Sequence, residues 1–242
     1  MSVKISKTGV MTTGGPTPSW MLRGSAAKTA MAQEDAMADQ KKERAIWRWL
    51  MKPDEEGSCT FLDGDLDAEG IISAPLYYEH TCPAGGTWMS FPCLSHDGNC
   101  PACDGGDRPS LVGLFTVIDH RVRVSKDGTK EFKDTKKIFV SKRRTLKVLQ
   151  KMAEKYGTLA GARFDISRTG PKEPAVGSVF IPVDRSTIEE LTEKYGIEAV
   201  VVDYDEYVKS MYRTSDELEK LGFGTSEVIG RAVNTKNLDE AF

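Results

Sequence analysis

The middle of the chain has the hydrophobic pattern of short β-strands. Apolar residues alternate with polar ones, or run together for a few positions, in AIWRWLM (45–51), GSCTFLDGD (57–65), SLVGLFTVIDHRVRV (110–124), GARFDISRTG (161–170) and AVGSVFIPV (175–183). KPDEEG predicts a turn that joins the first two strands into a hairpin. KDG (126–128) predicts a turn that leads into the strand TKEFKDTKKIFVSKR. The pattern therefore predicts antiparallel strands.

One helix interrupts these strands. TLKVLQKMAEKYG (145–157) places Leu146 and Leu149 at helical spacing, and Thr145 and Gly157 stand where a helix is capped and ended. Short strands around one helix predict a mainly β, α+β fold. We expect an OB-like five-stranded Greek-key barrel with an inserted zinc-binding loop, and a β-sandwich is the alternative.

The two ends of the chain differ from this core. Capping boxes at Ser186/Glu189 and Thr214/Glu217 predict a helical, acidic C-terminal region. The N-terminal arm is rich in Ser, Thr, Gly and Pro and then in good helix formers, so we expect it to be flexible or helical. The predicted domains are the arm 1–44, the core 45–183 with the zinc insertion 77–107, and the acidic region and tail 184–242.

Charge divides the chain in the same way. The net charge is −3, but Lys and Arg number 9 against 15 Asp and Glu over 1–107, 17 against 7 over 108–183, and 7 against 14 over 184–242. A basic centre between acidic flanks indicates a polyanionic partner and a segment that competes with it. Without a long apolar run or a signal peptide, we expect a soluble, intracellular protein that does not contact membranes.

Cysteines and histidines gather in EHTCPAGGTWMSFPCLSHDGNCPACDGG (79–106), which holds four of the five cysteines and two of the three histidines. In a reducing compartment such a cluster favours metal binding over disulfides. Cys100 and Cys103 form a tight CPAC turn whose two thiolates can hold one ion. A redox dithiol is the alternative, but that motif belongs between a strand and a helix.

The metal needs two further ligands from upstream. The candidates are His80, Cys82, Cys93 and His96, and we prefer His80 and Cys93. Four protein ligands leave no open position for water or substrate, so the pattern predicts one structural zinc ion.

The basic centre supplies candidate phosphate contacts. Arg121 and Arg123 alternate with valines, which places both on one face of the predicted strand. The other candidate cations are Lys136, Lys137, Lys142, Arg143, Arg144 and Lys147. Aromatic candidates for stacking on unpaired bases are Trp49, Tyr77, Tyr78, Trp88 and Phe91. Stacking contributes ~1–3 kcal/mol per base and tolerates any sequence. The alternatives are a solvated basic face and, for Trp49, a place in the core.

The chain resembles phage single-stranded DNA-binding proteins, typified by the T-even helix-destabilising protein. The resemblance lies in the His, Cys, Cys, Cys order at positions 80, 93, 100 and 103, and in FLDGD, YYEH, CPACDGGDRPSLVGLFTVIDHR and DISRTG. It covers residues 45–183 and implies an OB fold with zinc on His80, Cys93, Cys100 and Cys103. The gap between the second and third ligands is shorter here, which leaves Cys82 or His96 as replacements.

Enzyme classes are poorly supported. FLDGDLDAEG (61–70) offers clustered carboxylates, but Ala68 and Ala74 stand where an EF-hand needs Gly and a carboxylate. The α/β alternation of a phosphohydrolase is lacking, as are a phosphate-binding loop, a Ser/His/Asp set and an HExxH motif. His120, among apolar neighbours, is interpreted as a packed or surface histidine. We expect no enzyme activity.

The sequence thus predicts a protein that coats single-stranded DNA in phage replication, recombination or repair, in the host cytoplasm. A zinc-containing accessory factor that binds duplex DNA or a polymerase is the alternative. Self-association along the strand is expected as well. The ending NTKNLDEAF places Asp239 and Glu240 before Phe242, and we expect this tail to bind replication proteins such as a polymerase, helicase or primase.

Overall fold

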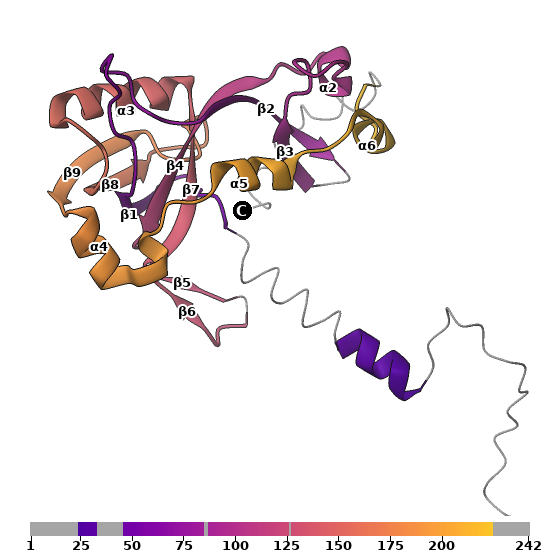
Figure 1. The fold of residues 1–242 in the computed structure, drawn as a ribbon, viewed down its shortest axis with the longest axis horizontal. Helices are drawn as coiled ribbons and strands as arrows, with labels where there is room; N and C mark the ends of the chain where they lie inside the picture. The colour runs from indigo at the N-terminus through magenta and orange to yellow at the C-terminus, as the bar shows by residue number, and fades with distance from the viewer. Residues whose placement is uncertain (1–23, 33–45, 85–86, 126, 225–242) are drawn as a thin grey trace, which may run out of the picture. The chain divides into compact units, whose positions relative to one another are not determined.

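The computed structural model describes residues 24–32, 46–84, 87–125 and 127–224, and the chain divides into two units, 1–45 and 46–242. The described part of the first unit is a helix over 25–32. The second unit contains all the described strands (Figure 1). None of the described helices is long and apolar enough to cross a membrane.

A seven-stranded antiparallel sheet organises the second unit. Its order is β3 (Thr87–Pro92), β2 (Leu76–Ala84), β4 (Ser110–Asp119), β1 (Glu55–Phe61), β8 (Ala162–Arg168) and β9 (Val179–Arg185), and β7 (Thr135–Lys142) also pairs with β4. A separate hairpin joins β5 (Arg123–Val124) to β6 (Glu131–Phe132).

Strand β4 is the branch point of the sheet. One edge pairs with β7 over 112–119, whereas the other edge is shared, with 110–113 on β2 and 117–119 on β1. Most of β4 is apolar and buried, as expected for a strand paired on both edges. Because β2 and β1 leave β4 in different places, the β2–β3 arm extends away from the rest of the sheet (Figure 1).

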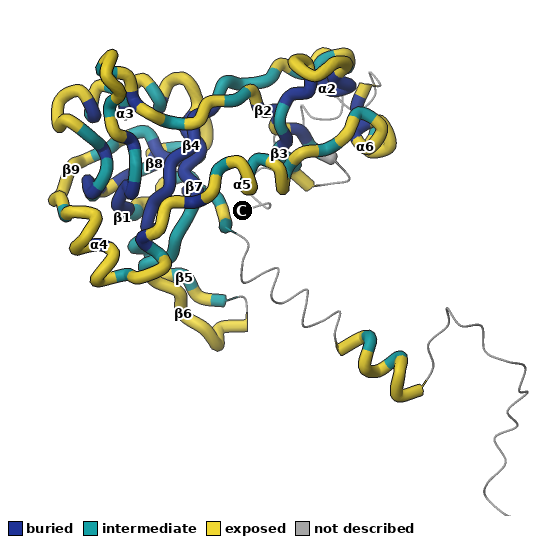
Figure 2. Tube along the Cα trace, viewed as in Figure 1, coloured by how far each residue is buried: buried dark blue, intermediate teal, exposed yellow. Residues whose placement is uncertain are grey.

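The main core lies between the sheet and helix α3 (Arg143–Tyr156) (Figure 2). Four phenylalanines meet at its centre: the ring of Phe61 lies 5.8 Å from Phe115, 5.2 Å from Phe139 and 5.7 Å from Phe164. These tilted and edge-on contacts are the arrangements that aromatic pairs prefer. They join four different strands, so the core depends on long-range pairing.

The predicted helix is confirmed, with a different start. It begins at Arg143, so Thr145 lies buried within the helix and does not cap it. Lys142 occupies the N-cap position without a side-chain hydrogen bond. It ends at Gly157, whose φ of 84° is the left-handed conformation that glycine adopts most easily.

The α+β class and its antiparallel strands are confirmed, but details of the pairing differ. The segment 45–51 does not pair with β1; instead the Trp49 amide donates to the Ile138 carbonyl (2.7 Å) and the Ile138 amide to the Trp47 carbonyl (2.9 Å). A turn does join β5 and β6, and in it the Gly128 amide donates to the Ser125 carbonyl at 2.9 Å. Seven strands rather than five form the sheet, and the described strands form no closed barrel.

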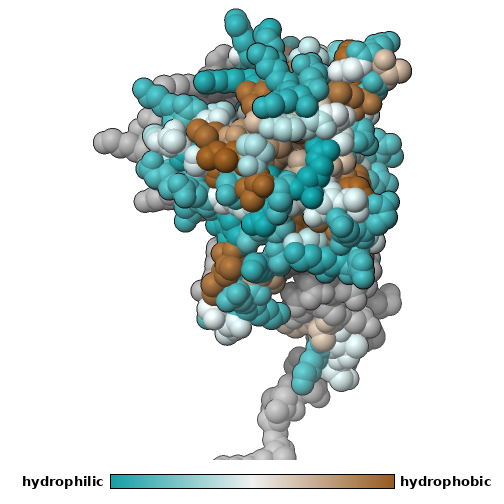
Figure 3. Space-filling view, turned by 90° about the vertical axis from the view of Figure 1, so that its left-hand side faces the viewer, coloured by the Kyte–Doolittle hydropathy of each residue, from teal (hydrophilic) through white to brown (hydrophobic). Residues whose placement is uncertain are grey.

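The part of the predicted acidic C-terminal region that the structure describes, 184–224, is mainly helical. It contains α4 (Ile188–Tyr195), a 3₁₀ turn η1 (Gly196–Ala199), α5 (Tyr204–Met211) and α6 (Ser215–Lys220). The capping box of α6 is Thr214/Glu217 as predicted, whereas that of α4 is Thr187/Glu190, one residue later than expected. Figure 3 shows one face of the molecule, on which hydrophilic residues separate the hydrophobic ones.

A buried carboxyl group connects this region to the sheet. Asp63 accepts hydrogen bonds from the Tyr204 hydroxyl and the Thr116 amide. Burial raises the pKa of Asp63 to about 7, although the bonds from Tyr204 and Thr116 oppose the rise.

Asp63→Asn is expected to flatten the pH dependence of stability. A carboxyl whose pKa is raised by folding stabilises the fold fully below its unfolded value near 4, and that contribution is lost as pH rises through about 7. Within this window the wild-type free energy of unfolding should fall by at most about 1.4 kcal/mol per pH unit. Urea titrations between pH 4 and 8 measure this, and an equal slope in the variant would contradict it.

Candidate metal centre and cationic surface

Four predicted ligands come together in a compact cluster. The ligand atoms of His80, Cys93, Cys100 and Cys103 all lie within 4.8 Å of one another. The His80 Nε2 atom is 3.5 Å from the Cys100 sulfur and 3.4 Å from the Cys103 sulfur, and the Cys93 and Cys103 sulfurs are 3.6 Å apart. Three of the four residues are buried. The cluster could hold one metal ion.

The β2–β3 hairpin positions two of these ligands. His80 in β2 lies opposite Phe91 in β3, and their rings stack with centroids 5.4 Å apart. Cys93 follows β3 directly, and its amide donates to the Tyr78 carbonyl at 2.8 Å. Strand pairing therefore positions the backbone of both ligands.

A short turn positions the other two ligands. Cys100 is the N-cap residue of helix α2 (Pro101–Asp104) and Cys103 lies within it, and the Asp104 amide donates to the Cys100 carbonyl at 3.0 Å. Proline at the first helical position suits a helix start, because its missing N–H would have no partner there. The turn directs both sulfurs at His80.

Acidic and polar neighbours support the ligands. The Asp107 carboxylate lies 2.6 Å from the Nδ1 atom of His80, an arrangement that leaves Nε2 facing the sulfurs and orients the ring. Burial raises the pKa of Cys93, but hydrogen bonds with Ser95, His80 and Cys103 outweigh it and lower the pKa to about 6, whereas burial and the bonds with Cys93 and Cys100 raise the pKa of Cys103. A low pKa favours the thiolate that a metal requires.

The structure separates the two alternative ligands from the cluster. His96 is exposed and lies against Tyr78, with ring centroids 6.0 Å apart. Cys82 is buried beside Asp107, on the Nδ1 side of His80, and burial together with its bond to Asp107 raises its pKa to about 12. Neither belongs to the group of His80, Cys93, Cys100 and Cys103.

The C-terminal region covers this cluster. Leu218 of α6 and Phe223 are buried in one apolar group with Phe91, and the rings of Phe91 and Phe223 meet edge to face at 5.2 Å. The Ser215 hydroxyl donates to the Asn99 carbonyl at 3.3 Å. Segments far apart in sequence thus form one metal module, a contact that local sequence patterns did not indicate.

Two predicted stacking residues lie in cores instead. Trp49 is fully buried and donates its indole N–H to the Val176 carbonyl at 3.2 Å. Phe91 is fully buried against His80. Neither ring is available to a base, which corrects the expectation for both. Tyr77 is half-buried, and its hydroxyl donates to Glu79 at 2.6 Å.

Several predicted phosphate contacts are occupied within the protein. Arg121 is paired with Asp119 and Glu55, and Arg123 with Glu55. Strand β4 ends before them, so they do not continue its face as predicted. The Lys136 ammonium donates to the carbonyls of η1 and the residue after it, Ile197 and Val200. Lys137 lines a cavity with both arginines.

The remaining predicted residues form an exposed cationic surface. Tyr78 of β2 is 44% exposed. It shares a face of the sheet with Leu76, two residues earlier. Leu76 and Leu146 of α3 both approach Gly113, so this is the face on which α3 lies. Beside Tyr78, the start of α3 presents exposed side chains without an ion pair among the described residues: Lys142, Arg143, Arg144 and Lys147. We call this set with Tyr78 the cationic surface.

Register shows that the two parts of the cationic surface are close. Tyr78 pairs with Leu111 of β4, and the next β4 residue, Val112, pairs with Lys142. Two strand spacings of about 4.8 Å separate the Tyr78 and Lys142 backbones, although Lys142, opposite Val112, lies on the other face of the sheet from Tyr78. Trp88 is also exposed but lies on the opposite face of the hairpin, with Ser90.

The predicted tail contacts Asp239, Glu240 and Phe242 lie outside the described residues. Comparison with known families finds no family model that matches the chain, and comparison with curated proteins finds none that matches it.

Proposed function

We propose that this protein binds single-stranded DNA without sequence preference, and that zinc fixes the module beside the binding surface. The cationic surface carries the proposal. Unpaired cations track phosphates, and an exposed ring beside them offers a platform on which a base stacks. The expected OB-like arrangement of the strands belongs to the same proposal, as does the resemblance to phage single-stranded DNA-binding proteins.

The geometry of the cluster supports zinc as the ion. Zinc bonds of about 2.3 Å to sulfur and about 2.0 Å to nitrogen place tetrahedral ligand atoms about 3.5–3.8 Å apart. The three separations of 3.4, 3.5 and 3.6 Å lie close to that range. One imidazole and three thiolates form a closed structural set, in which His80 and the cysteines hold the ion and leave no place for substrate.

The cations at the start of α3 support a polyanionic ligand. The first turn holds Arg143 and Arg144 and no acidic residue, although a helix N-terminus favours negative charge. Like charges at this end repel the helix dipole and each other. A phosphate chain beside them would relieve both repulsions, which an ordinary surface would avoid by an acidic cap.

Charge reversal of Arg143 and Arg144 to Glu is expected to weaken oligo-dT binding and to reduce its salt dependence. Each lost phosphate contact removes ~0.7 from the slope of log K against log salt for single strands. Anisotropy of a labelled oligo-dT at several salt concentrations measures both effects. Lys130→Glu with Lys172→Glu is the control, because both lysines are exposed elsewhere and the charge change is the same.

Two results would contradict the proposal. An unchanged slope in the Arg143 and Arg144 variant would mean that these side chains are only solvated. Equal affinity of the wild type for duplex and single-stranded DNA would favour the duplex-binding accessory factor, because stacking on Tyr78 requires unpaired bases. Tyr78→Ala should weaken oligo-dT binding by ~1–3 kcal/mol without changing the salt slope.

A further inference from the structure

A cavity of about 260 Å³ lies where the end of β4 meets β7 and the segment 48–55. It is separate from the cationic surface, because none of the residues of that surface lines it. Five of its lining side chains are cationic and two are carboxylates. The question is whether these charges satisfy one another.

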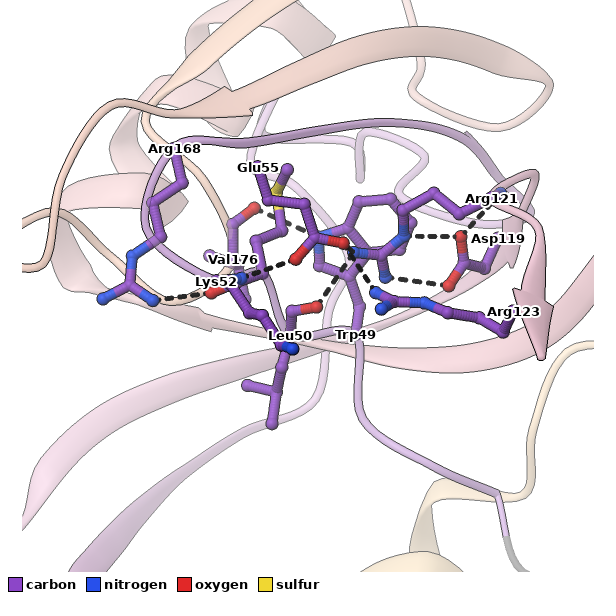
Figure 4. A network of polar contacts seen from close by, with 10 residues as sticks. Trp49, Leu50, Lys52, Glu55, Asp119, Arg121, Arg123, Arg168 and Val176 are labelled. Atoms are coloured by element: carbon purple, nitrogen blue, oxygen red, sulfur yellow. Dashed lines mark hydrogen bonds and ion pairs between the residues drawn. The ribbon is translucent and has the colours of Figure 1, made fainter. Parts of the chain in front are cut away.

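The two carboxylates are already fully used. Asp119 accepts two bonds from Arg121, both at 2.8 Å, in a bidentate pair. One Glu55 oxygen accepts from Arg121 at 2.9 Å and from Arg123 at 2.8 Å, and the other accepts from the Lys52 amide at 2.6 Å (Figure 4). Each carboxylate oxygen therefore has a donor before any ligand arrives.

Arg121 is a fixed wall of the cavity. Besides its ion pairs, it donates to the Leu50 carbonyl at 2.9 Å, and its guanidinium lies 3.7 Å from the centre of the Trp49 ring (Figure 4). Arg48 points its guanidinium at Glu79, which is not a cavity residue. These two arginines keep their positive charge near the cavity but have no spare bonding geometry.

Three cations keep unused donors. Lys137 is half-buried, and its ammonium makes no hydrogen bond or ion pair within the described residues. Burial lowers its pKa; the Asp119 carboxylate opposes this shift, and the charges of Arg121 and Arg123 add to it. Arg123 uses only Nη2, so its Nε and Nη1 atoms stay without a partner there. Lys52 is exposed, and its ammonium makes no hydrogen bond or ion pair with the residues that the structure describes. A charge that is partly desolvated and unpaired is costly, and an anion would offset that cost.

We propose that this cavity binds a phosphate group. An arginine fork and two ammonium groups match the several oxygens and the charge of a tetrahedral phosphate. The volume lies below the ~300–1,000 Å³ of sites for drug-sized ligands, which favours a single phosphate over a larger ligand. This phosphate is the terminal phosphate of a DNA strand, a phosphate of the DNA backbone or a free phosphate compound. The inference does not rest on the proposed DNA binding.

Inorganic phosphate is the probe. At constant ionic strength, kept with sodium chloride, phosphate should raise the melting temperature of the full-length protein along a saturable curve, since it binds the folded state. Lys137→Met keeps the apolar stem and should weaken phosphate binding at least tenfold in calorimetry. Lys130→Met, on the neighbouring β5–β6 turn, is the matched control and should bind as the wild type does.

The proposal fails if phosphate and chloride give the same melting temperature, or if Lys137→Met binds phosphate as tightly as the wild type. Should Lys137→Met be unfolded by circular dichroism, Arg123→Gln replaces it, with the same expected loss. Charge reversal at Arg143 and Arg144 should leave phosphate binding intact, so a failure of the DNA proposal is distinguishable from a failure here.

Oligo-dT with and without a 5′-phosphate identifies the source. A preference for the phosphorylated strand that Lys137→Met abolishes assigns the cavity to a terminal phosphate. Equal weakening of both strands by Lys137→Met assigns it to the backbone. Unchanged binding of both, with phosphate binding lost, assigns it to free phosphate compounds.

Discussion

Removal of the metal is expected to unfold the metal module and leave the main core folded. Structural zinc in small modules contributes an apparent ~10–16 kcal/mol at neutral pH, and this binding energy is folding energy. Without an ion, three sulfurs and an imidazole would be crowded in a buried site. The main core contains none of the four ligands, because it lies between α3 and the strands on the other side of the β4 branch.

Two measurements check this expectation. Metal analysis should find one zinc per chain in the wild type and none in Cys100→Ser. In Cys100→Ser or after chelation, hydrogen exchange should show lost protection of β3, α2 and α6, while β1 and β8 stay protected. Loss of protection in α6 is the distinctive part, because Leu218 and Phe223 pack on the module.

Cys82→Ser is the matched control for the same experiment. Cys82 is a buried cysteine of the same module but is not part of the group formed by His80, Cys93, Cys100 and Cys103. The variant should keep its zinc. Zinc lost from Cys82→Ser and retained in Cys93→Ser would reverse the ligand assignment, and a metal-free wild type with full protection of the module would falsify the site.

The elements with local signals were predictable from sequence. The helix α3, the β5–β6 turn and the strands β8 and β9 follow from periodicity and turn residues within short windows. The cluster that could hold a metal was predictable for the same reason, because three of its four residues lie within 11 positions and their residue types are those of metal ligands. Such signals need no knowledge of which segments meet.

Burial and partners depended on distant segments, so they could not be predicted. Alternation in AIWRWLM assigns Trp49 to one of two faces, but only its pairing with β7 decides that this face is the core. Likewise the sequence alone does not show that Arg121 is paired with Glu55, because Glu55 comes from another strand. Counting charges in the sequence gives the number of cationic residues but does not show which of them are unpaired in the fold.

A buried ion pair joins three distant segments of the chain. Arg48 pairs with Glu79 of β2, with Nη1 at 3.0 Å from Oε1, and its Nε atom donates to the Tyr207 hydroxyl of α5 at 2.8 Å. The Glu79 side chain is 1% exposed. Although burial alone would lower it, the pKa of Arg48 is raised, because its hydrogen bond and charge attraction to Glu79 stabilise the charged form.

Arg48→Ala is therefore expected to destabilise the fold by ~3–5 kcal/mol, since it leaves a buried carboxylate without its counter-charge. Removing both charges, with Arg48→Met and Glu79→Gln together, should recover most of this loss, because the amide can still accept from Tyr77. Urea unfolding of Arg48→Met, of Glu79→Gln and of the double variant gives the coupling energy. Arg143→Ala, at an exposed site, should change stability by less than ~0.5 kcal/mol. A loss below 1 kcal/mol in Arg48→Ala would show that water reaches Glu79, and that α5 and the segment 46–49 are not fixed to β2 by this pair.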